Sequence, residues 1–285
     1  LASITIPNGV TDIGEYTFYN CQKLTSVTFP NSLISIGESA FSKCDSLTSI
    51  TIPNNVTSID SFSFSDCKSL SNITIPDSVK SIGYSAFCNC TSITTIAIPS
   101  SVTSIGNYAF SGCADLTEIK VAAKNKNYVS VNGVLYNKDK TKLICYPPEK
   151  QGNNYRIFDN VTSIEGNAFK GCASLTDIII PDSVKSIGVG AFESCSSLKN
   201  ITIPNGIKSI SEYAFNDCAS LTNMTIPCGV TSIGYYAFSG CTNLVSIIIP
   251  KTVTNIGWYA FNKCSGLSDI TIPDSVLSIG ERAFY

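Results

Sequence analysis

Large aliphatic side chains recur along this chain in short clusters that are separated by polar and turn-forming residues. In one such cluster the apolar residues are Leu47, Ile50 and Ile52, and the residues between them are serine or threonine. This alternation predicts a short strand with one buried face at residues 49–52. Pro53 follows and ends the strand, because proline has no N–H to donate to a ladder.

Two further elements are predicted after each proline. Val56 and Ile59 indicate a second short extended segment, which a glycine closes in most repeats, as at Gly83. The next run, for example residues 108–113, predicts one or two helical turns that bury an alanine, a phenylalanine and a cysteine. We call one strand, one second extended segment and one such turn a rung.

The rung returns every 23 residues, and this period organises the whole chain. Five units of 23 residues fill 1–115, one of 36 fills 116–151, five of 23 fill 152–266, and a partial unit of 19 fills 267–285. One rung cannot bury its apolar faces alone, whereas stacked rungs can. We therefore predict a single α/β repeat solenoid of about twelve rungs over residues 1–285.

The repeated motif carries a resemblance to a known family. The form I-P-x-x-V-x-x-I-G-x-x-A-F-x-x-C, preceded by L-x-x-I-x-I, resembles the BspA-like leucine-rich repeats of surface proteins from anaerobic mucosal bacteria and some parasitic protists. The 36-residue unit with VNGVLYNKDKTKLICYPP resembles an irregular unit within that family. The resemblance implies a right-handed superhelix that is secreted or displayed at the cell surface. It also implies adhesion to host proteins or other cells, as for some members, and it carries over no catalytic residues.

Composition narrows the possible functions. The chain has no histidine, which excludes Ser-His and Cys-His nucleophiles and histidine metal ligands. The formal net charge is −2, so no general field attracts nucleic acid or an anionic membrane. The chain contains no run of 18 apolar residues, and its N-terminal LASITIPNGV resembles no signal peptide. Because the chain opens and closes inside the repeat, we expect it to be a piece of a longer protein.

Thirteen cysteines are present, and ten of them keep the 23-residue step. Neighbouring cysteines of this column would lie about 5 Å apart, within disulfide reach. A step of 23 without C-x-x-C argues against a zinc knuckle. We expect reduced thiols that pack in the core, with disulfides or a metal site as the alternatives. Cys88, Cys145 and Cys228 break the register. Cys88 and Cys228 fall at variable positions, so they are the better candidates for a reactive thiol.

Three surfaces are candidates for ligand binding. The outward positions of the first strands carry mostly Ser, Thr and Asn, which suits either a binding surface or a solvated sheet face. Aromatic residues gather at two variable positions of the late rungs, where early rungs hold Glu or Ser, and these form either a contact surface or a stack between rungs. The late aromatic residues are Tyr213, Tyr235, Tyr236, Trp258 and Tyr259.

The third candidate is the irregular rung, which is basic. The segment 118–156 carries a charge of +5, whereas the remainder carries −7. Residues 134–136 and 142–146 predict a hairpin, which would project Lys138, Lys140 and Lys142 toward an anionic partner. The adjoining strand offers Glu118 and Lys120 as a charged outward pair. The alternative is that these lysines form a solvated tip.

The sequence therefore predicts a non-enzymatic recognition module without cofactor or metal. We expect a monomeric adhesin, extracellular or at the cell surface, that binds a protein or glycan of a host or a neighbouring cell. The alternative is a structural spacer array that displays another domain and binds nothing. An enzyme that uses carboxylates is disfavoured, because no Asp/Glu pair stands out from the variable positions.

Overall fold

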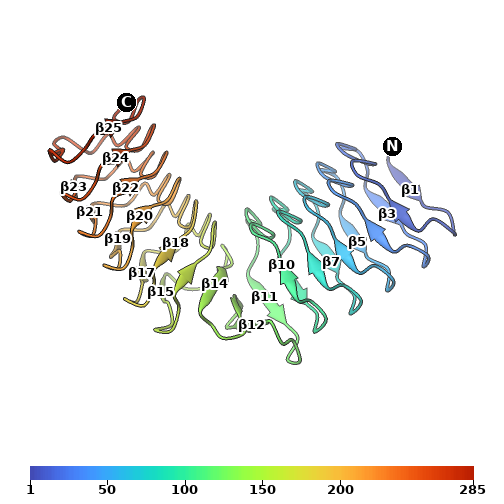
Figure 1. The fold of residues 1–285 in the computed structure, drawn as a ribbon. Coiled ribbons are helices and arrows are strands. Elements are labelled where there is room, and N and C mark those ends of the chain that lie inside the picture. Colours follow the sequence, from blue (N-terminus) through green and yellow to red (C-terminus); the bar gives the residue numbers. More distant parts are fainter. The chain divides into compact units, whose positions relative to one another are not determined.

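The structure is a computed structural model that describes residues 1–285, and its regular elements are all strands. Contacts divide the chain into two compact units, Leu1–Lys138 and Asp139–Tyr285. In each unit, rungs with short strands follow one another in sequence order (Figure 1). The division falls inside the irregular rung, so each unit is described separately.

In the first unit, two sets of parallel strands run through the rungs, and paired residues are 23 positions apart, as Ile50 and Ile73 are. We call the L-x-x-I-x-I strands the first ladder and the second extended segments the second ladder. The first ladder consists of β1 (Ser3–Thr5), β3 (Ser26–Thr28), β5 (Ser49–Thr51), β7 (Asn72–Thr74), β9 (Thr95–Ile98) and β11 (Glu118–Val121). The second ladder consists of β2 (Asp12–Ile13), β4 (Ser35–Ile36), β6 (Ser58–Ile59), β8 (Ser81–Ile82) and β10 (Ser104–Ile105).

The second unit repeats the two ladders. Its first ladder consists of β15 (Asn154–Arg156), β17 (Asp177–Ile179), β19 (Asn200–Ile201), β21 (Asn223–Thr225) and β23 (Ser246–Ile248). Its second ladder consists of β14 (Lys142–Cys145), β16 (Ser163–Ile164), β18 (Ser186–Ile187), β20 (Ser209–Ile210), β22 (Ser232–Ile233), β24 (Asn255–Ile256) and β25 (Ser278–Ile279). Residues 269–271 stand at the first-ladder position of the partial unit, but they form no strand.

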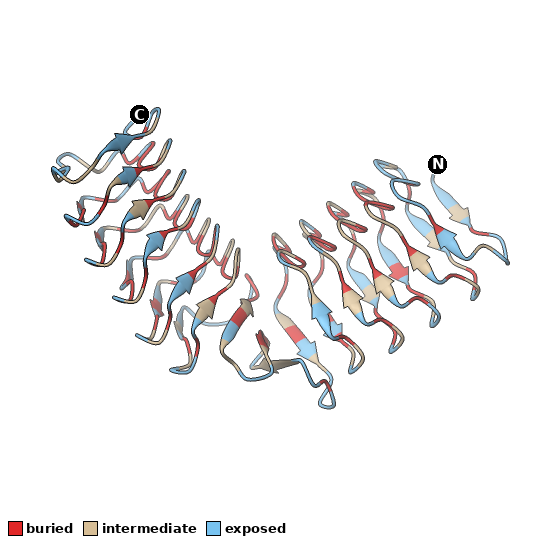
Figure 2. Cartoon of the chain, viewed as in Figure 1, coloured by how far each residue is buried: buried red, intermediate tan, exposed pale blue.

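The core is a column of phenylalanine rings that passes from rung to rung. Phe41 and Phe64 stack with centroids 5.5 Å apart and an interplanar angle of 5°, and Phe64 and Phe87 stack at 5.6 Å and 3°. In the second unit Phe215 and Phe238 repeat this geometry at 5.4 Å and 5°. Buried positions recur at the same place in successive rungs (Figure 2). The core therefore extends along the stack of rungs, as the repeat predicts.

The segment predicted as a helical turn is not helical. Its N–H groups alternate between two kinds of partner: Tyr19 N donates to Tyr16 O of the same rung at 3.0 Å, whereas Phe18 N donates to Ala40 O of the next rung at 2.8 Å. An α-helix needs its N–H groups bonded four residues back in the same segment. Tyr16 and Asn20 also have φ values of 55° and 60°, outside the right-handed helical region. Hydrogen bonds between rungs therefore replace the predicted helix by a series of turns.

Serine and threonine side chains tie neighbouring rungs together. The Ser78 hydroxyl donates to Val56 O at 2.6 Å, and Thr117 Oγ1 donates to Thr94 O at 2.9 Å. Such bonds add to the main-chain hydrogen bonds between rungs, as at Thr94 O, which also accepts the Thr117 N–H at 2.9 Å. They explain how a chain with only 14% charged residues keeps a polar surface that also stabilises the stack.

The irregular rung carries a buried asparagine, Asn125, at the position where Val102 stands one rung earlier. Asn125 is 1% exposed, and its Nδ2 donates to Pro99 O at 2.8 Å and to Val102 O at 3.0 Å. Its Oδ1 accepts from the N–H groups of Asn127 and Tyr128. Because all these groups are paired, a polar side chain replaces an apolar one in the core without leaving a donor unsatisfied.

Two strands follow Asn125 and complete the first unit. β12 (Tyr128–Val131) and β13 (Val134–Asn137) pair antiparallel. Asn132 and Gly133 connect them with φ values of 51° and 83°, which is the backbone of a two-residue hairpin turn. The sequence prediction included a strand at 134–136 and one at 142–146, and β13 and β14 occupy these places. It missed β12 as the antiparallel partner of β13.

Candidate functional site

The turn segments form one surface of each unit, which we call the turn face. In the second unit, two consecutive residues of each of these segments point inward, as Ala237 and Phe238 do, and both of these are fully buried. The preceding residues point outward and carry the late aromatic side chains. Trp258 is 55% exposed and Tyr235 is 48% exposed. The structure therefore places the predicted aromatic residues on one solvent-facing surface.

Three of these aromatic residues form what we call the tyrosine column. The rings of Tyr213 and Tyr236 are 5.0 Å apart, and those of Tyr236 and Tyr259 are 4.7 Å apart, with interplanar angles of 5° and 4°. Arg282 extends the column, because its guanidinium lies 5.9 Å from the Tyr259 ring and donates to the Tyr259 hydroxyl at 3.0 Å. Sequence reasoning missed Arg282, although it stands exactly one period after Tyr259.

Tyr235 and Trp258 form a second, separate pair on the turn face. Their rings are 5.9 Å apart and inclined by 29°. The same position holds Glu212 one rung earlier and Glu281 one rung later.

Desolvation by partial burial raises the pKa of Tyr213 in the tyrosine column, and the neighbouring Tyr236 and Glu212 add to this effect. The contact-surface and stacking interpretations are compatible here, since the rings stack along the solenoid and keep an exposed edge or face.

The first unit carries a smaller aromatic group at the same two positions. Tyr84 contacts Phe62 with an interplanar angle of 63° and Tyr108 with an angle of 88°. These rings meet edge to face, whereas the tyrosine column stacks face to face. This group lies outside the residues predicted from the sequence as candidates, and it provides a natural comparison for the second unit.

The predicted basic residues all lie at the surface with partners of their own. In the first unit Lys120 forms an ion pair with Glu118 at 2.8 Å, and Lys138 Nζ donates to Asn125 O at 2.7 Å. In the second unit Lys140 lies 5.6 Å from the centre of the Phe158 ring. Lys142 Nζ lies 4.0 Å from Glu165 and remains exposed.

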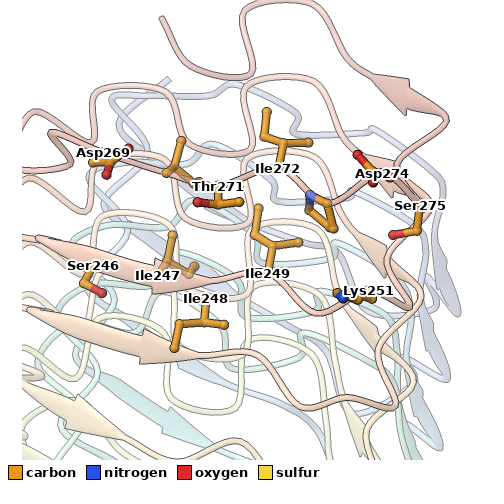
Figure 3. A pocket seen from close by; sticks show the side chains of 12 residues that line it. Ser246, Ile247, Ile248, Ile249, Lys251, Asp269, Thr271, Ile272, Asp274 and Ser275 are labelled. Atoms are coloured by element: carbon orange, nitrogen blue, oxygen red, sulfur yellow. The ribbon is translucent and has the colours of Figure 1, made fainter.

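The strand face of the second unit is the outward surface of its first ladder, and a depression lined by both polar and apolar residues lies at its last two rungs. Ile248 is 62% exposed there. Figure 3 shows Ile247, Ile248 and Ile249 along one rung opposite Thr271 and Ile272 of the next. The depression lies where residues 269–271 do not continue the ladder.

The in-register cysteines are core residues with a defined hydrogen bond. The Sγ of Cys67, Cys195 and seven others donates to the carbonyl oxygen of the aromatic residue 26 positions earlier, for example Cys67 to Phe41 at 3.1 Å. Burial raises the pKa of the Cys113 thiol to about 12, and the charge of Cys88 adds to the shift. The nine donors are Cys44, Cys67, Cys90, Cys113, Cys172, Cys195, Cys218, Cys241 and Cys264.

The cysteines outside the register differ in exposure. Cys228 is exposed, as its variable position indicated, whereas Cys88 is half-buried and Cys145 is buried. No group of three or more Cys, Asp or Glu side chains converges in a way that would hold a metal ion. The structure also contains no helix with the length and apolar character needed to cross a membrane.

Comparison with known families identifies this architecture. The chain matches the family described as the BspA type leucine rich repeat region, with six copies, over residues 1–117, 35–160 and 162–285. The chain belongs to the BspA-type leucine-rich repeat family. Its solenoid of about twelve turns has the leucine-rich repeat fold. Leucine-rich repeat proteins of this kind are generally modules that bind proteins, and no catalytic family is indicated.

Solved structures of bacterial proteins share this fold. A leucine-rich cell surface protein from Faecalibacterium prausnitzii is 38% identical, with a TM-score of 0.84, over 94% of this BspA-type chain and 78% of that protein. A leucine-rich repeat protein from Eubacterium ventriosum is 28% identical, with a TM-score of 0.74, over 99% of this chain and 90% of that one. The pneumococcal vaccine antigen PcpA, 24% identical with a TM-score of 0.82 over 96% of this chain and 73% of that one, shares the fold. No curated protein matches the chain.

Proposed function

We propose that this chain is the recognition part of an adhesin, secreted or displayed at the cell surface, and that it acts without catalysis. Membership of a family of binding modules supports this role. The similarity to a Faecalibacterium prausnitzii protein described as a cell surface protein supports the location. The partner is a protein or a glycan of a host or of a neighbouring cell.

The observation that carries the proposal is the exposed aromatic surface on the turn face of the second unit. An aromatic ring that stays in contact with water forgoes the favourable free energy of burial inside a protein. Early rungs hold Ser39 and Ser61 at the same two positions, so the fold does not require aromatic residues there. Exposed Tyr and Trp residues are enriched where proteins make contacts, and a purely structural spacer has no need for them.

The lysines of the irregular rung are a second candidate contact for the same function. Lys120 and Lys142 have exposed side chains although each lies near a carboxylate. Exposed ion pairs of this kind contribute little to stability, so an anionic partner can displace them at low cost. Contacts from these lysines would weaken with salt, because charges are screened over about 10 Å at 0.1 M.

A binding survey tests the proposal. The purified chain is passed over immobilised matrix proteins, mucins and glycans at low and at physiological salt. We expect saturable binding to at least one of these surfaces. Retention that disappears with salt would assign the contact to the lysines, and retention that persists would assign it to the aromatic surface. The absence of saturable binding across the survey would contradict adhesion and favour the spacer alternative.

A further inference from the structure

The Tyr235–Trp258 pair borders a groove in the second unit. The groove runs over β22, β24 and β25 and has a volume of about 470 Å³. Its lining includes the two rings, the carboxylate of Glu212 and the outward side chains of the second ladder. These outward side chains belong to Ser232, Asn255 and Ser278. An aromatic wall and a row of polar groups therefore face the same space.

Glycine follows the isoleucine of the second ladder in three successive rungs, and Gly234, Gly257 and Gly280 all line the groove. A Cβ on Gly257 would lie 2.6 Å from the carbonyl carbon of Gly234, so a side chain would force the rungs apart. A Cβ on Gly280 would collide with the Trp258 main chain and its ring. The glycines thus allow successive rungs to approach closely, and Gly280 lets the Trp258 ring lie against the following rung.

The polar row consists of neutral hydrogen-bonding groups. Asn255 Nδ2 donates to Ser278 Oγ at 2.6 Å, and Thr254 Oγ1 donates to Asn255 Oδ1 at 3.1 Å. Amides and hydroxyls both donate and accept, so this row can match ligand hydroxyl groups in either sense. Glu212 adds a carboxylate, which accepts from hydroxyl groups and forms no ion pair with a basic residue of the protein.

Charge and shape together select the ligand. Glu212 is the only charged residue in the lining, so an anionic ligand is repelled. The half-exposed rings suit a flat surface of C–H groups, whose partial positive charge is attracted to an aromatic face. A sugar ring offers such a face together with hydroxyl groups at its edge. A basic peptide would also be attracted to Glu212, but that carboxylate offers it only one ion pair, and the rest of the lining is neutral.

We infer that this groove binds an uncharged oligosaccharide. The inference rests on the proposed recognition function and gives it a ligand class and a site. Tyr235 and Trp258 form the platform for one or two sugar rings. Glu212 accepts hydrogen bonds from the ring hydroxyls, Asn255 donates to them or accepts from them, and the groove continues across three rungs.

The test uses the intact chain and neutral hexasaccharides of glucose, mannose and N-acetylglucosamine. Trp258 is the only tryptophan, so its emission reports directly on this site. Because the side chain is 55% exposed, we expect emission of a partly solvated indole that shifts on binding. Calorimetry then measures the affinity of the variants. Trp258→Ser and Tyr235→Ser should each weaken binding at least tenfold, and Glu212→Gln should weaken it several-fold.

Tyr84→Ser is the matched control, since it removes an aromatic residue at the same rung position in the first unit and should leave affinity unchanged. All serine variants should remain folded, because Ser61 occupies this position naturally. The inference is overturned if no hexasaccharide binds, if oligolysine alone binds, or if binding survives Trp258→Ser. Binding of the chain to a matrix protein that Trp258→Ser leaves intact would retain the recognition function and remove only the saccharide site.

Discussion

The Sγ of Cys90 donates a hydrogen bond to the main-chain oxygen of Phe64 in the preceding rung, at 3.0 Å. The same oxygen accepts the N–H of Cys67 at 3.3 Å. One carbonyl group therefore joins two rungs at the level of the phenylalanine column. This bond gives the cysteine column a structural role that packing volume alone does not, and it accounts for a thiol at this position in rung after rung.

Removal of one such thiol should destabilise the stack. We expect Cys113→Ala to lower the free energy of unfolding by about 1 to 3 kcal/mol, through a lost hydrogen bond and a small cavity. Cys113→Ser should fall at the lower end of that range, because its hydroxyl retains Phe87 O as a partner. Urea unfolding measures both variants. Cys228→Ser, at an exposed position, is the control and should be nearly silent; equal effects at the two positions would contradict the role of the buried column.

Alkaline pH should unfold the protein through the same thiols. Burial raises the pKa of the Cys44 thiol to about 12 and that of Cys264 to about 11. It also raises the pKa of Cys90 and of Cys218 well above the ordinary value for a thiol. An unfolded thiol ionises near pH 8.5. Above that pH the unfolded state loses protons that the folded state keeps, so stability falls as the pH rises toward the folded pKa values.

The size of this effect is measurable. Each such thiol contributes up to about 1.4 kcal/mol per pH unit in that window, while below about pH 8 both states hold the proton and the stabilisation is complete. Urea midpoints at pH 7, 9 and 10 should therefore fall progressively. A variant with Cys90→Ala and Cys218→Ala should show a shallower fall. Midpoints that stay level from pH 7 to pH 10 would argue against protonated, buried thiols.

Deletion of a whole rung should leave a folded, shorter solenoid. Removal of residues 47–69 places Phe87 against Phe41, and each remaining main-chain partner is again one period away. Repeat proteins depend on contacts between nearest neighbours, so circular dichroism should show the same structure per residue. Removal of residues 47–57 alone shifts the register and should abolish cooperative unfolding. Similar loss of structure in both deletions would refute the assigned repeat unit.

The strands and the core columns could be predicted from the sequence because they depend on local alternation within one rung. Ile50 and Phe64 are buried where the pattern placed them, and Tyr235 and Trp258 are exposed. The prediction of a helical turn was wrong because half of the N–H groups in this segment donate to carbonyl groups of the next rung. The sequence of a single repeat does not show that these carbonyl groups compete with those of the same segment. Asn125 at a valine position and Asn132-Gly133 were signals of the β12–β13 hairpin that the analysis did not use.

The basic candidate contact also gives a specific outcome. Lys138→Ser, Lys140→Ser and Lys142→Ser together should reduce retention on heparin and make it less dependent on salt, because each lysine removed takes away a screened contact. The thermal midpoint should fall by only a few degrees, since the exposed Lys142–Glu165 ion pair contributes about 0 to 1 kcal/mol and the Lys138 hydrogen bond to Asn125 O about 0.5 to 1.5 kcal/mol. Lys80→Ser, Lys199→Ser and Lys208→Ser form a control variant with the same change in charge. Equal loss of retention in the two variants would reduce the effect to net charge.

The most direct measurement compares the binding of two variants, each altered in three rungs, to an immobilised partner that retains the natural chain. In one variant Tyr213, Tyr235, Tyr236, Trp258 and Tyr259 are all replaced by serine, which the early rungs carry at equivalent positions and similar backbone angles, as Ser39 does at a φ of 54°. In the other, Tyr16, Tyr84 and Tyr108 of the first unit are replaced by serine. The account predicts that the first variant stays folded and loses binding, while the second binds as the natural chain does. Full binding by the first variant would contradict recognition through the aromatic turn face.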